Sequence, residues 1–269
     1  FGLAGMREIM KRVKLTVAYD GTHYCGWQIQ PNGNTIEAEL NHHLSELLGE
    51  PIRVIGASRT DAGVHALGNV AVFDTNARMP AEKISYAMNT RLPADIRIQK
   101  SEEVPADFHP RYCKTRKTYE YKICNRRFPD PCRRLYSLFY YWDLDERKMQ
   151  QAADYLVGTH DFTSFCTVRA QVKDHVRTIY DLSVIREGDM ITVRITGNGF
   201  LYNMVRIIAG TLLRVGSGQM EPEEMKHVLE AKNRELAADT ARPEGLTLVS
   251  IAYEPSADRT STEPLRQEP

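Results

Sequence analysis

The chain has no apolar run near the roughly 18 residues that a membrane-spanning helix needs, although 42% of its 269 residues are hydrophobic. It also lacks the basic, apolar and small-residue pattern of a secretory signal. Its five cysteines are odd in number, widely spaced and without a Cys-x-x-Cys pair, which predicts reduced thiols. These absences predict a cytoplasmic protein with no membrane attachment and no disulfide framework.

A metal centre is not predicted either. The neighbouring His42 and His43 lie in a predicted helix, where successive side chains point about 100° apart and cannot easily share a metal. The formal net charge is zero, and a neutral total by itself does not favour a nucleic-acid partner.

The distribution of charge does favour such a partner. Residues 106–134 contain nine Lys or Arg and three acids, whereas residues 219–269 contain six bases and eleven acids. Phosphate binding depends on the local density of Lys and Arg. The basic segment therefore predicts a polyanion on one face, although some of these residues will simply be solvated.

The first half of the chain predicts the order strand, helix, strand, strand, helix, strand. Apolar side chains recur at helical spacing from Thr35 to Leu48. Asn34 is the expected N-cap, with Glu37 as its return partner, and Gly49 the left-handed stop. The other expected elements are strands over 14–19, 52–57, 69–74 and 95–104, and a helix over 80–90.

A similar order recurs in the second half. We expect strands over 115–124, 178–186, 190–196 and 246–253, and helices over 145–157, 200–215 and after residue 222. The predicted fold is therefore α+β, with duplicated βαββαβ halves of the split, RRM-like type. Mixed, mainly antiparallel sheets, which either join or face one another, would be backed by helices around a central cleft.

Four segments are expected along the chain. They are an N-terminal extension (1–13), an N-terminal α+β domain (14–105), a C-terminal α+β domain (106–254) and a disordered tail (255–269).

The loop from Ser58 to His65 (SRTDAGVH) places an acid between two predicted strands. Loops held on rigid strands often carry reactive side chains, and Gly63 allows a tight turn or close approach to a ligand. The same residues are typical of an ordinary turn. From these residues alone, both interpretations of Asp61 stay open.

Arg206 and Tyr119 are two further positions that allow a structural interpretation as well as a functional one. Arg206 lies in an otherwise apolar predicted helix, where it could cover core with its stem and reach solvent with its head. Strand alternation places Tyr119 and Tyr121 on one face, which is typical of a core position.

Several sequence blocks, in one order over residues 14–253, resemble the signature blocks of the tRNA pseudouridine synthase A family. The matching blocks are YDGT (19–22), GWQ (26–28), RTDAGVH (59–65), FH (108–109), KTYEY (117–121), DFTSF (161–165) and MVR (204–206).

The resemblance implies isomerisation of uridine to pseudouridine within RNA, with no cofactor or metal. Asp61 would be the catalytic carboxylate and Arg206 its ion-pair partner. Tyr119 would stack on the target uracil, and Arg59 would occupy the space left by the flipped nucleotide. Leu201 is expected to line the pocket. The residues do not decide whether Asp61 attacks the sugar, attacks the base or abstracts a ribose proton.

The family substrate is the anticodon stem-loop of tRNA, at positions 38 to 40, and one tRNA spans both subunits of a homodimer. Arg116 and Lys117 are expected to neutralise phosphates. Further tRNA contacts are expected at Phe108, His109, Pro110, Arg111, Tyr112, Arg169, Ala170, Gln171, Val172 and Lys173. The segment 169–173 departs from the family pattern more than the signature blocks do. Structural support is expected from Asp20, Gly21, Trp27, Phe162 and Phe165.

Two other classes compete with this interpretation. Split βαβ sheets with exposed aromatic side chains also bind RNA without any chemistry. An Asp-nucleophile hydrolase or phosphotransferase is the other class, but no glycine-rich phosphate loop or Mg²⁺-type acid cluster accompanies Asp61.

Overall fold

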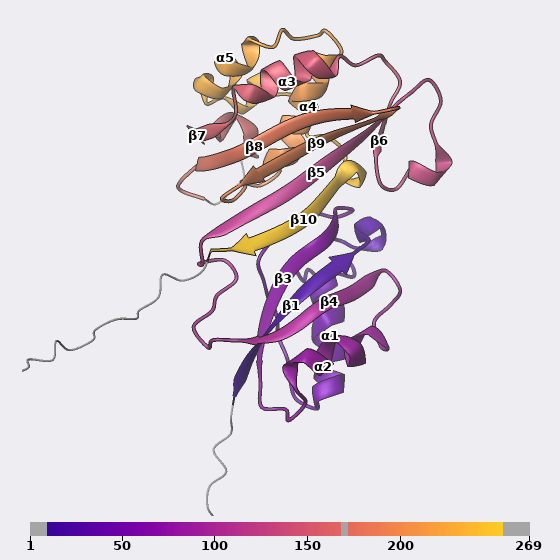
Figure 1. The fold of residues 1–269 in the computed structure, drawn as a ribbon, viewed down its shortest axis with the longest axis vertical. Helices are drawn as coiled ribbons and strands as arrows, with labels where there is room; N and C mark the ends of the chain where they lie inside the picture. Colours follow the sequence, from indigo (N-terminus) through magenta and orange to yellow (C-terminus); the bar gives the residue numbers. More distant parts are fainter. Residues whose placement is uncertain (1–9, 168–171, 255–269) are drawn as a thin grey trace, which may run out of the picture.

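The computed structural model describes residues 10–167 and 172–254. The strands are β1 (Lys11–Tyr19), β2 (Ile55–Gly56), β3 (His65–Thr75), β4 (Ile96–Val104), β5 (Thr115–Asn125), β6 (Leu138–Tyr140), β7 (Gly158–Asp161), β8 (Val176–Glu187), β9 (Met190–Gly197) and β10 (Leu246–Tyr253). They form one sheet in the order β4-β1-β3-β10-β5-β9-β8-β7, with β2 beside β3 and β6 beside β5 (Figure 1).

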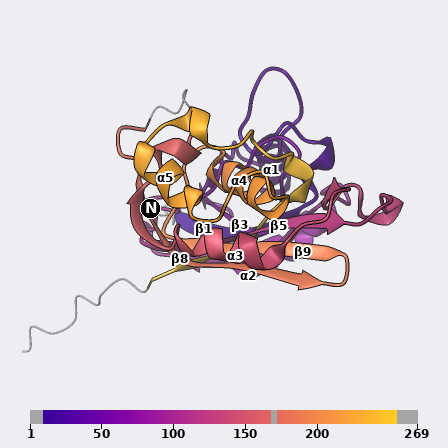
Figure 2. The same ribbon diagram turned by 90° about the horizontal axis from the view of Figure 1, so that it is seen from above.

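Helices cover one face of this sheet. They are α1 (Ile36–Leu48), α2 (Ala81–Asn89), α3 (Glu146–Asp154), α4 (Met204–Gly216) and α5 (Glu224–Ala231). Seen from above, α1, α4 and α5 lie on the same side of the strands (Figure 2). Alternate residues of β1 and β9 are buried, as expected for a sheet with one covered face. Within the described ranges, no helix is both long and apolar enough to cross a bilayer.

The last strand joins the two halves of the chain. β10 pairs in parallel with β3, where Thr247 lies opposite His65, and antiparallel with β5 along its other edge. The two predicted sheets therefore join into one sheet and do not face each other. Apart from the β10–β3 and β5–β6 pairs, the strand pairs of the described residues are antiparallel.

The first half follows the predicted order β1-α1-β2-β3-α2-β4, while the second half departs from it. The short strands β6 and β7 were not predicted, and they flank α3. The hairpin of β8 and β9 is confirmed, with Glu187 opposite Met190, and β10 has the predicted bounds. The second half therefore contains strands beyond the predicted order, and the described residues form a mixed α+β fold with one large, mostly antiparallel sheet.

Several predicted boundaries were wrong. β3 begins at His65 and not at residue 69, because Ala66 already pairs with Tyr19, and α3 ends at Asp154 and not at residue 157. β1 begins at Lys11 and not at residue 14, because Val13 is fully buried and Arg12 pairs with Asp74 at 2.8 Å. β2 is reduced to two residues, because only Ile55 and Gly56 pair with β3. α4 begins at Met204 and not near residue 200, because Asn203 has a left-handed backbone with φ 61°. The predicted tail and residues 1–9 lie outside the described residues, and the domain division stays a prediction.

The N-cap of α1 was also predicted wrongly. Thr35 is the cap, and its hydroxyl accepts a hydrogen bond from the Ala38 amide at 3.3 Å. Asn34 accepts from the Thr35 amide, and Glu37 accepts from the amide of Ile29 at 2.9 Å. Gly49 does end the helix with φ 68°, as predicted.

Candidate active site

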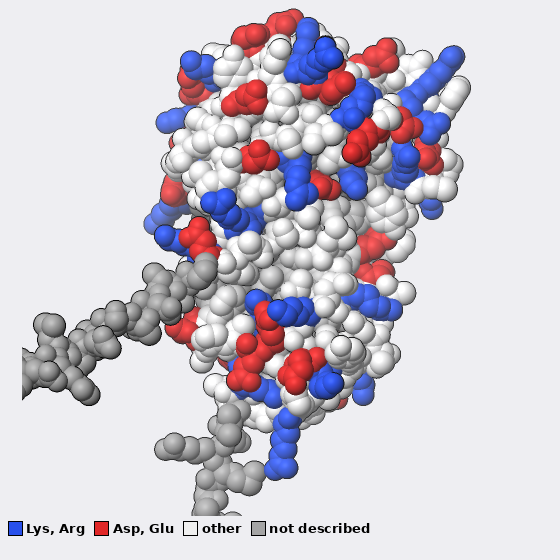
Figure 3. Space-filling model, viewed as in Figure 1, with Lys and Arg blue, Asp and Glu red and all other residues white. Residues whose placement is uncertain are grey.

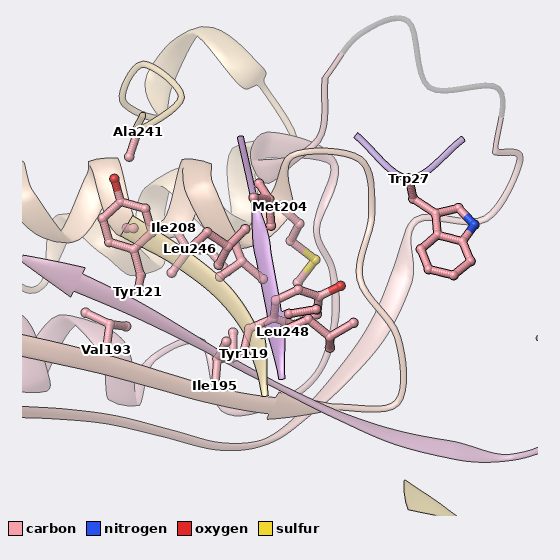
Figure 4. Packing of buried hydrophobic residues seen from close by; sticks show 14 of the residues in the cluster. Trp27, Tyr119, Tyr121, Val193, Ile195, Met204, Ile208, Ala241, Leu246 and Leu248 are labelled. Atoms are coloured by element: carbon pink, nitrogen blue, oxygen red, sulfur yellow. The ribbon is translucent and has the colours of Figure 1, made fainter. Parts of the chain in front are cut away.

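A pocket of about 680 Å³ opens on the helix-covered side of the sheet. Its walls are the loop before β3, the residues that lead into α4, and the inner faces of β5 and β10. Figure 4 shows Tyr119, Met204 and Leu246 side by side among the core residues at this place. The pocket brings together these predicted site residues: Arg59, Asp61, Arg111, Lys117, Tyr119, Val172, Leu201 and Arg206.

The loop that carries Asp61 is held by backbone contacts with residues 20–27. Trp27 N–H donates to Thr60 O at 3.0 Å, and Gly63 N–H donates to Tyr24 O at 3.4 Å. Gly26 has φ 84°, and a Cβ there would lie 2.7 Å from Thr60 O. A Cβ on Gly21 would likewise clash with Val64 O. The glycines of the YDGT and GWQ blocks therefore shape the loop, because only a glycine permits so close an approach of two backbones.

A chain of buried hydrogen bonds fixes the same loop from below. The hydroxyls of Thr60 and Tyr19 lie 2.6 Å apart. Asn69 Nδ2 donates to Tyr19 Oη at 3.1 Å and to Ser58 O at 3.0 Å, and Ser58 Oγ lies 2.8 Å from Tyr119 Oη. The loop and Tyr119 are therefore held in one network, in which Asn69 was not predicted because a strand asparagine has no distinctive sequence signal.

Asp61 and Arg206 form an ion pair. Arg206 Nη1 lies 3.0 Å from Asp61 Oδ2, and Arg206 Nε donates to Ala241 O at 2.7 Å. The side chain of Arg206 is only 14% exposed, so its head lies in the site and not in solvent. Burial raises the pKa of Asp61 above its ordinary value, and Arg206 opposes that rise. Such a carboxylate, partly removed from water and held in one orientation, can act as a nucleophile or a base.

Tyr119 is 8% exposed and lines the pocket. Its ring meets that of Phe200 edge to face, with centroids 5.3 Å apart. Burial raises the pKa of Tyr119 to about 12, so the phenol is neutral near pH 7. Tyr121 is fully buried, and its hydroxyl donates to Arg242 O at 2.7 Å, which confirms the predicted core role.

The predicted support residues occupy the expected places. Trp27, Phe162 and Phe165 are buried, and Asp20 accepts hydrogen bonds from Thr22. Phe200 and Leu246 also line the pocket but were not predicted. Leu246 is placed there only by the pairing of β10 with β5, which no local sequence pattern indicates.

Only some residues of the segment 108–112 lie at the pocket, and the others lie elsewhere on the protein. Arg111 reaches the pocket, and its Nε donates to Gly56 O at 2.8 Å. Phe108 packs on Tyr253, and Tyr253 Oη donates to Pro110 O at 3.0 Å. His109 stacks on the exposed ring of Tyr112, with centroids 4.0 Å apart. Only part of this segment therefore faces the pocket.

The segment 169–173 is described only in part. Val172 lines the pocket and Lys173 is exposed, whereas Arg169, Ala170 and Gln171 lie outside the described residues.

The neighbouring histidines of α1 come closer than their 100° separation suggested. The potential ligand atoms of His42, His43 and Glu46 all lie within 4.8 Å of one another. His42 and Glu46 are exposed, and none of the three lines the pocket.

The chain matches the family model described as tRNA pseudouridine synthase over residues 15–113 and 152–254. The tRNA pseudouridine synthase A of Exiguobacterium sp. is 49% identical over 245 residues, covering 91% of this chain and 99% of that protein. The Bacillus pumilus protein of the same name is 46% identical over 245 residues, covering 90% and 99%. A chain of a solved Cbf5-Nop10-Gar1 complex is 16% identical with a TM-score of 0.34, over 75% of this chain and 45% of that chain.

These matches define the enzyme class as a tRNA pseudouridine synthase, an isomerase. More specifically, the chain belongs to the tRNA pseudouridine synthase A family, as the sequence blocks predicted. That membership decides against the hydrolase and the non-catalytic RNA-binding module.

Proposed function

We propose that this enzyme converts uridine to pseudouridine at positions 38 to 40 in the anticodon stem-loop of tRNA. The observation that carries the proposal is the Asp61–Arg206 ion pair in a pocket that also contains Tyr119. Among the described residues that line this pocket, Asp61 is the only one with an acidic side chain. A site with one oriented carboxylate and a stacking surface matches a reaction at the sugar and base of one nucleotide.

The reaction rearranges bonds within that nucleotide. The bond from uracil N1 to C1′ of the ribose breaks, the base turns while it is held, and a bond from C5 to C1′ forms. The proton leaves C5, and N1 gains a proton, so no atom is lost overall. Asp61 acts at the sugar or the base, or removes a ribose proton, and Arg206 holds it in position.

The target uridine must leave the RNA stack before it can reach Asp61. Tyr119 lines the pocket and provides a neutral aromatic surface on which the flipped base stacks. Arg59 is exposed at the pocket mouth between Ser58 and Thr60, both of which are buried and hydrogen bonded. We assign it to the space that the nucleotide leaves in the RNA helix.

The predicted contact segments complete the tRNA interface in this proposal. Arg111 and Lys117 approach the nucleotide inside the pocket, while His109, Tyr112 and Lys173 meet the flanking RNA from the surface. Arg169, Ala170 and Gln171 belong to the same proposed interface.

We also propose a homodimer, with one tRNA across both subunits, acting in the cytoplasm where tRNA is modified. The open face of the sheet supports self-association, because its middle carries few charged side chains (Figure 3). Exposed apolar residues on the surface include Leu67, which is 60% exposed.

The order of elements also supports the proposal that the chain consists of two related βαββαβ halves, with β6 and β7 as additions to the second half.

The experiment is position-specific mapping of pseudouridine in an unmodified tRNA transcript, incubated with the purified protein and no added cofactor. We expect modification at positions 38 to 40 by the unchanged protein. Asp61→Asn should lower turnover by roughly 10⁴-fold or more, with tRNA affinity nearly unchanged, because it removes the reacting carboxylate.

The matched control is Asp143→Asn, which changes an exposed acid outside the pocket and should leave turnover unchanged. Turnover retained by Asp61→Asn would refute the assignment of Asp61. Modification only outside positions 38 to 40 would refute the assigned site while leaving the chemistry.

A further inference from the structure

Lys117 occupies an unusual place in the pocket. It lies two residues before Tyr119 on β5, and both side chains line the pocket. Residues two apart on a strand are separated by about 7 Å along it. Lys117 is half-buried, and its Nζ donates to Ala57 O at 3.0 Å. The ammonium group of Lys117 therefore lies beside Tyr119, the proposed stacking surface, on the same face of β5.

The surroundings of Lys117 are positive. Within residues 10–167 and 172–254, no carboxylate lies within ion-pair distance of Lys117 or Arg111, and Asp61 is paired with Arg206. Burial, followed by repulsion from Arg111 and Arg177, lowers the pKa of Lys117 to about 8. Burial, followed by repulsion from Arg59, lowers the pKa of Arg111, and Glu37 partly opposes this shift. Keeping these cations close together, with no carboxylate paired to them, costs free energy. A bound anion would lower this cost by attracting both charges.

Arg111 and Lys117 donate hydrogen bonds to the backbone carbonyls of two consecutive residues. Arg111 Nε donates to Gly56 O at 2.8 Å, and Lys117 Nζ donates to Ala57 O at 3.0 Å. Each side chain keeps further N–H groups that these bonds do not use. The two cations therefore form one pair of donors beside the loop that carries Asp61.

The other basic residues of β5 do not share this position. The guanidinium of Arg116 lies over the ring of Tyr180, 4.3 Å from its centroid, and Arg116 is exposed. Lys122 lines a different pocket, together with Glu120 and Thr247. The structure thus separates Lys117 from Arg116, although the two are neighbours in the sequence.

We propose that Lys117, together with Arg111, binds the phosphate group of the flipped nucleotide. The inference rests on the proposed function, which places the base on Tyr119 and the ribose at Asp61. A phosphodiester next to that ribose carries one negative charge, and it reaches a cation one strand step from the base. The site would then recognise the nucleotide through its base, sugar and phosphate together.

The test measures the affinity of an anticodon stem-loop RNA for the full protein at several salt concentrations. Lys117→Gln should weaken binding about 10-fold and reduce the slope of log affinity against log salt by about 0.7 to 0.9, the effect of one phosphate contact. Lys117→Arg, which keeps the charge, should restore most of the affinity. Lys226→Gln is the matched control, because it removes the same charge at an exposed position of α5 outside the pocket, and it should leave affinity unchanged.

A second measurement neutralises the two phosphates that flank the target uridine, one at a time, with methylphosphonates. In the unchanged protein, one of these substitutions should weaken binding about 10-fold. In Lys117→Gln the same substitution should cause a clearly smaller loss, because only Arg111 then remains of the two cations that bind that phosphate. This coupling does not depend on any small change that the variant makes in folding.

Equal losses from the methylphosphonate in both proteins would overturn the inference, as would equal losses from Lys117→Gln and Lys226→Gln. Pseudouridine formation in the unmodified stem-loop is measured in parallel with the unchanged protein. Normal formation without coupling would refute the phosphate site and leave the proposed function standing. Coupling without any pseudouridine formation would support the phosphate site and refute the proposed reaction at this substrate.

Discussion

The two halves of the molecule contribute to the pocket in different ways. The first half supplies Arg59 and Asp61 from an irregular loop between β2 and β3. The second half supplies Tyr119 from the middle of β5 and Arg206 from the first turn of α4. The acid therefore depends on loop geometry, whereas its partners depend on the placement of regular elements.

This difference explains which residues surround each group. The loop needs Gly26 and the amide of Trp27 to hold its backbone, and a buried hydrogen-bond network to fix its side chains. Arg206 needs few dedicated contacts to fix its backbone, because α4 is packed into the core along most of its length. Apart from loss of Asp61 itself, the first half should thus be sensitive mainly to backbone changes, and the second half to loss of single functional groups.

After the loss of Asp61 itself, the largest expected effect tests the contribution of the second half. Arg206→Gln removes the ion pair with Asp61 and should lower turnover by about 10²-fold or more, a loss typical of a removed charged donor. The matched control is Arg214→Gln, in the last turn of the same helix and outside the pocket. Single-turnover rates on tRNA transcript measure both, and equal rates for the two variants would contradict the assigned role of Arg206.

The same variant should change the pH dependence of turnover. Burial already raises the pKa of Asp61, and Arg206 opposes the rise, so removing Arg206 should raise that pKa further. If the ionised carboxylate is the active form, turnover is lost as the pH falls through the pKa of Asp61. The acid side of the rate–pH profile should therefore move to higher pH in Arg206→Gln, and an unmoved profile would argue against Asp61 as the titrating group.

A middle-sized effect tests the loop of the first half. Gly26→Ala would place a Cβ 2.7 Å from Thr60 O in a backbone with φ 84°, and we expect a loss of about 3 kcal/mol in unfolding free energy. Gly49→Ala is the control, because it has φ 68° with nothing within 4 Å of the added Cβ, and should lose about 1 kcal/mol. Urea unfolding measures both, and equal losses would show that the close approach to the loop is unimportant.

The smallest effect compares two tyrosines of one strand. Tyr119→Phe and Tyr121→Phe each remove one hydroxyl with a single hydrogen-bond partner, Ser58 in the first case and the Arg242 carbonyl in the second. Each should lose about 1 kcal/mol of unfolding free energy. Only Tyr119→Phe should also lower kcat/KM, by less than about 10-fold because the stacking ring remains. A similar decrease in Tyr121→Phe would mean that the effect comes through folding alone.

Much of the fold could be predicted from the sequence because its signals are local. The apolar stripe and the final Gly49 predicted α1, and turn residues predicted the hairpin of β8 and β9. One error arose where two neighbouring residues compete for one role. Thr35 and Asn34 are both able to cap α1, and the hydrogen bonds made by the preceding loop decide between them.

The candidate site was predicted mainly through resemblance to a family. The residues around Asp61, taken alone, favoured an ordinary turn, and Arg206 could have reached solvent. The structure places them 3.0 Å apart although 145 residues separate them in the chain. Asn69, Phe200 and Leu246 were missed because their contributions come from long-range contacts.

By itself, the sequence determined the separate elements, the order in which they occur and the residue types available for chemistry, since each depends on interactions within a few residues. Only the tertiary structure decided that β10 joins the halves into one sheet and that Asp61 meets Arg206. It also separated Lys117 from Arg116, because side chains of a strand alternate and burial differs on its two faces. Which face is covered depends on helices that lie far away in the chain.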